Sequence, residues 1–133
     1  FAFTRVGRVG VDLERVRPLG NLEGLVERFF AGPEKERFRV LEPSLRERAF
    51  FRAWTCKEAV LKAIGRGVQS LDCCEVAFEP GEESRVISLN GETDCGRWSL
   101  REWEPESGFL AALAVSRESG IGNRQSGNPD VTD

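Results

Sequence analysis

Residues 44–67 read SLRERAFFRAWTCKEAVLKAIGRG, and this stretch decides the class of fold. Ser44 and Glu47 have the S-x-x-E spacing of a capping box, which favours a helix start. Apolar side chains then recur at helical spacing as far as Ile64. Two glycines follow in the closing G-R-G and are expected to end the helix. The sequence therefore predicts one long helix that runs to about Ile64.

Upstream of this helix, the sequence predicts a β-hairpin. Phe1–Val6 and Val9–Glu14 are typical strand segments on either side of Gly7-Arg8, a two-residue loop whose leading glycine suits a type II′ turn. Apolar and polar residues alternate in the second segment, so Val11 and Leu13 are expected to face the core.

Two short helices are predicted between the hairpin and the long helix. Asn21 can cap the first, whose apolar stripe ends at Phe29-Phe30. Gly32-Pro33 starts the second, which ends near Leu41. Downstream of the long helix, the sequence predicts four strands, at Cys74–Phe78, Val86–Leu89, Trp98–Trp103 and Phe109–Val115. Asn90-Gly91 predicts a turn after the second of them. The last strand is apolar throughout and is expected to be buried on both faces.

The order of these elements predicts an α+β fold, in which an antiparallel sheet has a helical insertion after the first hairpin. We expect residues 1–116 to form one domain. Residues 117–133 are rich in Ser, Gly, Asn and Asp and poor in apolar side chains, so we expect a disordered tail.

Composition excludes several classes of function. A net charge of −3 argues against a nucleic-acid-binding protein. No apolar run approaches the ~18 residues of a membrane span, and no secretory signal opens the chain. The four cysteines lack the spacing of a zinc site, which favours reduced thiols in the cytoplasm. Without histidine, Ser-His-Asp and Cys-His catalysis are excluded, so chemistry must rely on carboxylates and lysines, with or without a hard metal ion.

Two carboxylates could hold such an ion. Asp12 and Glu14 lie two residues apart on a predicted strand, so both project from the same face. Mg²⁺ prefers oxygen ligands and is commonly held by one or two carboxylates together with substrate phosphates. The alternative is an ordinary solvent-facing strand edge.

The long helix carries candidate cations. Lys57 falls within the apolar stripe, where its ammonium must either snorkel to solvent or find an anion. Glu58 and Lys62 lie beside the stripe, four residues apart, and could form only a weak helix-surface pair. Gly65-Arg66 could approach a phosphate closely, although a helix C-cap also explains the glycine.

Several segments together resemble a known family. They are, in chain order, VGVDLE at 9–14, FFAGPE at 29–34, WTCKEAVLK at 54–62, GRG at 65–67 and the closing strand at 108–115. The pattern resembles the 4′-phosphopantetheinyl transferases and covers nearly all of residues 1–116. The D-x-E segment and the tryptophan favour the catalytic, C-terminal half of the surfactin-synthetase-activating (Sfp) type.

The resemblance implies a reaction and a set of site residues. The family moves 4′-phosphopantetheine from coenzyme A to a serine of an acyl or peptidyl carrier protein. By resemblance, Asp12, Glu14 and Glu58 would bind Mg²⁺ against the pyrophosphate of coenzyme A. Lys62, helped by Lys57, would contact the phosphates together with Gly65-Arg66. Glu58 would take the proton from the carrier serine, with Lys62 and Lys57 as the other catalytic residues.

The resemblance also implies that part of the machinery lies outside this chain. Members of the larger type have two similar halves, and the sequence opens where the first half would be finishing. We therefore expect that an N-terminal half or a partner subunit is needed. The alternatives are a short, trimeric holo-acyl-carrier-protein synthase and a non-catalytic domain that binds a carrier protein.

Overall fold

The structure, a computed structural model, describes residues 6–117 of the 133. Its elements follow in this order: β1 (Val6–Arg15), α1 (Leu22–Phe29), α2 (Gly32–Arg39), α3 (Pro43–Ala63), the 3₁₀ helix η2 (Val68–Cys73), β2 (Cys74–Val76), β3 (Val86–Leu89), β4 (Trp98–Trp103) and β5 (Phe109–Arg117). Among these residues no helix is long and apolar enough to cross a membrane.

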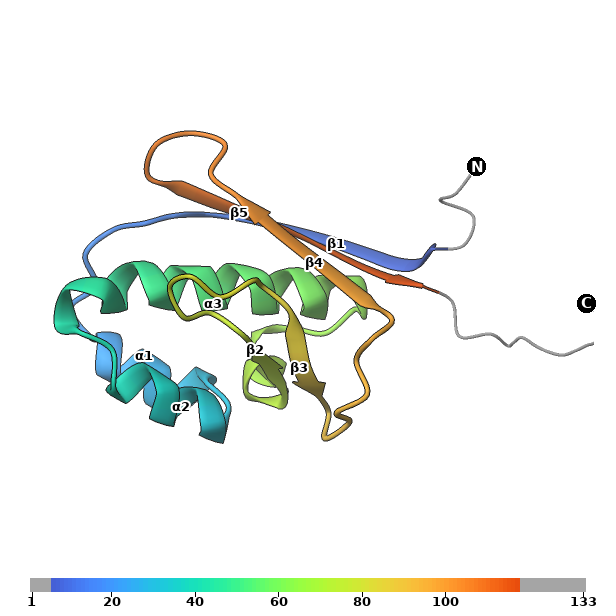
Figure 1. The fold of residues 1–133 in the computed structure, drawn as a ribbon, viewed down its shortest axis with the longest axis horizontal. Coiled ribbons are helices and arrows are strands. Elements are labelled where there is room, and N and C mark those ends of the chain that lie inside the picture. The colour runs from blue at the N-terminus through green and yellow to red at the C-terminus, as the bar shows by residue number, and fades with distance from the viewer. Residues whose placement is uncertain (1–5, 118–133) are drawn as a thin grey trace, which may run out of the picture.

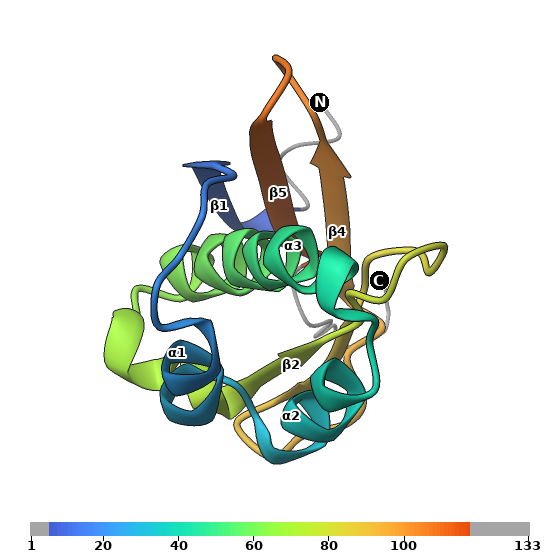
Figure 2. The same ribbon diagram turned by 90° about the vertical axis from the view of Figure 1, so that its left-hand side faces the viewer.

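Helix α3 separates two layers. On one side lies an antiparallel three-stranded sheet in the order β1-β5-β4. On the other side lie α1, α2 and the small sheet of β2 and β3 (Figures 1 and 2). The α+β class and the antiparallel sheet are therefore confirmed, with the helices inserted after the first strand that the structure describes.

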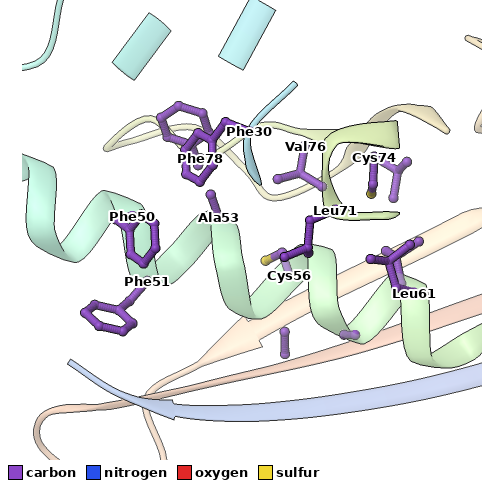
Figure 3. Packing of buried hydrophobic residues seen from close by; sticks show 14 of the residues in the cluster. Phe30, Phe50, Phe51, Ala53, Cys56, Leu61, Leu71, Cys74, Val76 and Phe78 are labelled. Carbon is purple, nitrogen blue, oxygen red and sulfur yellow. The ribbon is translucent and has the colours of Figure 1, made fainter. Parts of the chain in front are cut away.

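The core lies mainly between α3 and the second layer (Figure 3). Phe50 of α3 stacks on Phe30, with 5.6 Å between ring centroids. Phe30 in turn contacts Phe78 edge-on at 5.9 Å. Central strand β5 buries Leu110 and its inward-facing alanines against α3, but its outer face is only partly covered, so burial on both faces is not complete.

The predicted turn at Gly7-Arg8 is wrong. Strand β1 runs through both residues and pairs with β5 along its whole length, from Val6 opposite Arg117 to Arg15 opposite Phe109. The pairing register shifts between Val6 and Arg8, as in a β-bulge. Gly7 therefore lies at an irregularity within a strand and not in a hairpin turn. Phe1–Arg5, the first predicted strand, lie outside the described residues.

The face of β1 that packs on α3 is also the opposite of the one predicted. Val11 and Leu13 are 52% and 56% exposed, whereas Asp12 is 6% exposed and turned toward α3. Gly10 makes this possible, because a Cβ there would lie 2.0 Å from the carbonyl oxygen of Ala59. The absence of a side chain lets strand and helix approach closely.

The ends of α3 differ in how well they could be predicted. The capping box is not formed, because the N-cap is Glu42, two residues before Ser44, and it makes no side-chain cap; the helix itself begins at Pro43. The C-terminal end is as predicted. Gly65 has a φ of +76°, and the Arg66 N–H donates to the Leu61 carbonyl at 2.8 Å, which is the Schellman arrangement.

Other local predictions have mixed outcomes. Asn21 precedes α1 as predicted, but its side chain makes no capping hydrogen bond. The turn at Asn90-Gly91 is confirmed, since both residues have positive φ values, 53° and 85°. All four cysteines are free. Residues 118–133, most of the predicted tail, lie outside the described residues.

Candidate active site

Strand β1 and helix α3 bring four charged side chains together. Asp12 and Glu14 project from the inner face of β1, and Glu58 and Lys62 project from α3 one turn apart. The Lys62 ammonium donates to Asp12 Oδ1 at 2.7 Å. Lys62 is therefore paired across the two elements with Asp12, and the local pair with Glu58 that its spacing allowed is not formed.

The three carboxyl groups are close enough to perturb one another. Burial, followed by the charge and hydrogen bonding of Asp12, raises the pKa of Glu14 to about 7. Burial and the Asp12 charge also raise the pKa of Glu58. Because like charges at one site disfavour ionisation, the cluster retains a proton under conditions in which an isolated carboxyl would have lost it.

Lys62 is the cation that offsets this negative charge. Its hydrogen bond to Asp12, and the charges of Asp12, Glu58 and Glu14, raise its pKa, so it stays protonated. The Lys62 side chain is 51% exposed, which leaves it free to change partners when an anionic ligand arrives.

The donor chemistry of the cluster fits a hard divalent cation. Asp12 Oδ2 is buried and has no hydrogen-bond partner among the described residues. A buried carboxylate oxygen without a partner is costly, and a Mg²⁺ ion would satisfy it. In the part of the chain that the structure describes, no three acidic or cysteine side chains stand in ready-made metal geometry. The Lys62 ammonium is bound to Asp12 instead.

Lys57 is not part of this cluster. It points to the other side of α3, where its ammonium lies 2.5 Å from Glu34 Oε1 and 3.1 Å from the Phe29 carbonyl oxygen. The exposed fraction of its side chain is 1%, and that of Glu34 is 0%. Lys57 therefore pairs with an anion inside the protein and does not extend its ammonium to solvent. In this conformation Lys57 can serve the site only through the placement of α3.

Glu34 is a residue that sequence reasoning did not assign a role. Its Oε1 accepts from the Ala31 N–H at 2.9 Å, and its Oε2 accepts from the Val76 N–H at 2.8 Å. The carboxylate therefore connects α2, β2 and α3 through Lys57. Its only signal in the sequence is the spacing after Phe29-Phe30.

The remaining candidates lie just beyond α3. Gly65 ends the helix, and Arg66 donates to Ser70 Oγ at 3.2 Å with an otherwise exposed side chain. Both follow Lys62 by about one helical turn, on the way out of the acidic cluster. Cys56 is excluded as a nucleophile, because burial raises the pKa of its thiol to about 12.

Comparison with known proteins identifies the family. A family model described as the 4′-phosphopantetheinyl transferase superfamily matches residues 8–114, which hold every residue of the acidic cluster. The chain belongs to the 4′-phosphopantetheinyl transferase superfamily. The resemblance inferred from the sequence motifs is confirmed at this level.

Individual relatives are longer than this chain. The 4′-phosphopantetheinyl transferase HetI of Nostoc sp. (strain PCC 7120) is 40% identical over 109 residues, which make up 82% of this chain and 44% of that protein. The 4′-phosphopantetheinyl transferase of Bacillus subtilis is 22% identical over 81% of this chain and 46% of its own length. The chain thus spans about half the length of these curated relatives.

Among solved structures, the fold of this chain matches nearly the whole of a protein that is shorter than the two relatives above. The holo-(acyl-carrier-protein) synthase of Bacillus anthracis str. Ames, solved in complex with CoA (3′,5′-ADP), superimposes with a TM-score of 0.64. The match covers 85% of this chain and 97% of that one at 21% identity. At this identity the likeness shows the fold alone.

Proposed function

We propose that this chain carries the catalytic site for Mg²⁺-dependent transfer of 4′-phosphopantetheine from coenzyme A to a serine of a carrier protein, in the cytoplasm. The observation that carries the proposal is the convergence of Asp12 and Glu14 from β1 with Glu58 and Lys62 from α3. Membership of the transferase superfamily supports the reaction class.

The roles of the residues follow from their surroundings. Asp12, Glu14 and Glu58 would hold Mg²⁺, which when bound neutralises charge on the pyrophosphate of coenzyme A. Lys62 would release Asp12 to the metal and pair with a phosphate. Burial and the Asp12 charge raise the pKa of Glu58, which makes it a better proton acceptor than an ordinary carboxylate, and it would take the proton from the carrier serine.

Lys57 and the Gly65-Arg66 loop have supporting roles in this proposal. The buried Lys57–Glu34 pair would fix the rotation of α3 and so the position of Glu58, the next residue. The exposed Arg66 guanidinium would meet a phosphate of coenzyme A beyond Lys62. Direct contact between Lys57 and coenzyme A is not expected, because its side chain is closed off from solvent.

We also propose that the chain acts with a second body, an N-terminal half as in the Sfp type. The outer face of the three-stranded sheet supports this. Val9, Val11 and Leu13 of β1 are each more than half exposed there, and Trp103 of β4, on the other side of β5, is 47% exposed. An apolar stripe of this kind is typical of a surface that another protein element covers. The match to HetI covers 44% of that protein, so HetI has further sequence outside the matched part.

Two other functions deserve a test. The extent of the match to the Bacillus anthracis synthase favours a short holo-acyl-carrier-protein synthase, in which identical chains would complete one another's sites. A non-catalytic domain that binds a carrier protein would keep the fold without the chemistry. Sedimentation of the purified chain distinguishes the short synthase from the Sfp type. A trimer would favour the short synthase.

Titration of coenzyme A with and without Mg²⁺ tests the proposal itself. We expect Mg²⁺-dependent binding that Asp12→Asn and Glu58→Gln each weaken by at least about tenfold, as for loss of a charged contact. Glu83→Gln is the matched control, because Glu83 is exposed and forms no ion pair among residues 6–117. Equal binding in Mg²⁺ and in EDTA would contradict the metal site. No binding of coenzyme A at all would favour the non-catalytic domain.

A further inference from the structure

A pocket of about 380 Å³ lies on the side of α3 that faces β4, away from the acidic cluster. It is lined by the first turns of α3, the loop after β2, the end of β4 and the start of β5. Arg52 of the pocket precedes Glu58 by six residues, which places the two side chains about 120° apart around the helix. Because β5 lies between β1 and β4, the strand that carries Asp12 and Glu14 is ~10 Å from the strand that borders the pocket. The pocket and the acidic cluster are therefore separate sites.

The interior of the pocket is apolar. Ala49, Phe78 and Leu110 line it and are each 5% exposed or less. Leu45 of α3 and Trp103 of β4 border this buried surface and are 43% and 47% exposed. A cavity of this size with mainly apolar walls and few polar groups is typical of a small-molecule site. The Trp103 indole also offers a flat surface against which a ring can pack.

Two arginines lie on the lining, and the first of them has no donor left for a ligand. Arg52 donates from all three of its nitrogens to acceptors on β4 and on the loop after β2: Glu102, Ser84 and the carbonyl oxygens of Phe78, Glu79 and Glu82. A guanidinium has five N–H donors, so these five bonds use all of them. Arg52 therefore holds the loop against α3 and β4 and forms a fixed part of the wall.

The second arginine, Arg48, has donors that remain free. Its one ion pair among residues 6–117 is with Glu104 at 3.4 Å, which is long for a hydrogen bond, and its side chain is 55% exposed. Glu104 Oε2 also accepts from the Gly108 N–H at 3.0 Å. Glu104 would therefore keep a partner if Arg48 turned to a ligand. A guanidinium presents two parallel N–H groups, which match the two oxygens of a carboxylate.

We propose that this pocket binds a small molecule in which a compact apolar body, such as an aromatic ring, carries a single carboxylate. The body would lie between Leu45 and Trp103, and the carboxylate would pair with Arg48. Glu102 and Glu104 on the same lining disfavour a ligand with further negative charge. The inference uses none of the residues proposed for transfer of 4′-phosphopantetheine, so it does not depend on the proposed function.

Calorimetric titration with 2-naphthoate, and with 2-naphthylmethanol as its neutral counterpart, tests the carboxylate contact. We expect Arg48→Gln to weaken binding of 2-naphthoate by roughly tenfold, the loss of one charge-assisted contact, and to leave 2-naphthylmethanol unchanged. Arg85→Gln is the matched control, because Arg85 is 60% exposed and is paired with Glu82 at 3.3 Å, but lies outside the pocket. No binding of 2-naphthoate at millimolar concentration, or an equal loss in Arg85→Gln, would overturn the proposal.

The change Leu45→Ala tests the apolar part of the pocket with the same two probes. We expect it to weaken both by roughly fivefold, because each loses apolar contact with one wall. Val68→Ala is the control, since Val68 is 41% exposed and lies outside the pocket. Unchanged binding in Leu45→Ala would place the probes elsewhere and contradict the proposal. Asp12→Asn should leave both probes unaffected, so a failed metal site and a failed pocket give different results.

Discussion

The ammonium of Lys57 lies 2.5 Å from the carboxylate of Glu34, and neither side chain reaches solvent. The pair links α3 to the start of α2, and the Val76 N–H extends the link to β2. Lys57 also lies over the Phe30 ring, 4.6 Å from its centroid. Burial raises the pKa of Glu34, although Lys57 opposes that shift. The ion pair is therefore sustained by its contacts inside the core.

Removal of one partner should be strongly destabilising. We expect Glu34→Ala to lower the free energy of unfolding by about 3–5 kcal/mol, because it leaves the buried Lys57 charge without an anion. Urea denaturation measures this. Glu27→Ala is the matched control, since the Glu27–Lys35 pair is largely exposed and should be worth at most ~1 kcal/mol. Similar losses of unfolding free energy in the two variants would mean that the buried pair stabilises the fold no more than an exposed one.

Gly10 sets the distance between β1 and α3. A methyl group there would lie 2.0 Å from Ala59 O and 2.6 Å from Ala63 N, both backbone atoms. We expect Gly10→Ala to cost about 1–3 kcal/mol or more and to weaken Mg²⁺-dependent binding of coenzyme A, because Asp12 moves with the strand. Gly20→Ala is the control, with nothing within 4 Å of the added carbon. Unchanged stability in Gly10→Ala would contradict the close approach.

The pH dependence of stability should reveal the raised pKa of Glu14. The pKa of Glu14 is about 7 in the folded chain, against 4.5 for an ordinary glutamate such as one in the unfolded chain. Between these two pH values the folded chain therefore binds more protons than the unfolded chain. The free energy of unfolding should therefore fall as pH rises from about 4.5 to about 7. Glu14→Gln should remove this component. Mg²⁺ should bind more tightly as pH rises through the same range, because it competes with the proton. A Glu14→Gln variant with the same pH profile as the parent would contradict the shift.

The outer face of the sheet should promote association of the isolated chain. We expect concentration-dependent sedimentation that the triple change Val9→Thr, Val11→Thr, Leu13→Thr reduces, because it removes exposed apolar surface. Threonine retains the strand preference of valine, so the free energy of unfolding should change by no more than about 1 kcal/mol. Val40→Thr, at an isolated apolar side chain that is 83% exposed, should leave sedimentation unchanged.

Much of the fold follows from local patterns. Helical periodicity and the glycine after Ile64 predicted α3 and its C-terminal end, because both depend on residues within a turn of one another. Strand β3 follows from a short apolar segment with two β-branched residues, and β4 from a segment between two tryptophans. The start of α3 was predicted wrongly, because the proline at position 43 takes the first helical position and places Ser44 inside the helix.

The sequence by itself determined that Asp12 and Glu14 share one face of a strand, since strand side chains alternate regardless of what surrounds them. Only the tertiary structure decided that this face packs on α3 and that Val9, Val11 and Leu13 face outward. It also decided that Lys62 pairs with Asp12 while Lys57 pairs with Glu34. Periodicity defines two faces of a strand or helix. Which face becomes buried depends on a distant segment that fits against it, as Ala59 fits against Gly10.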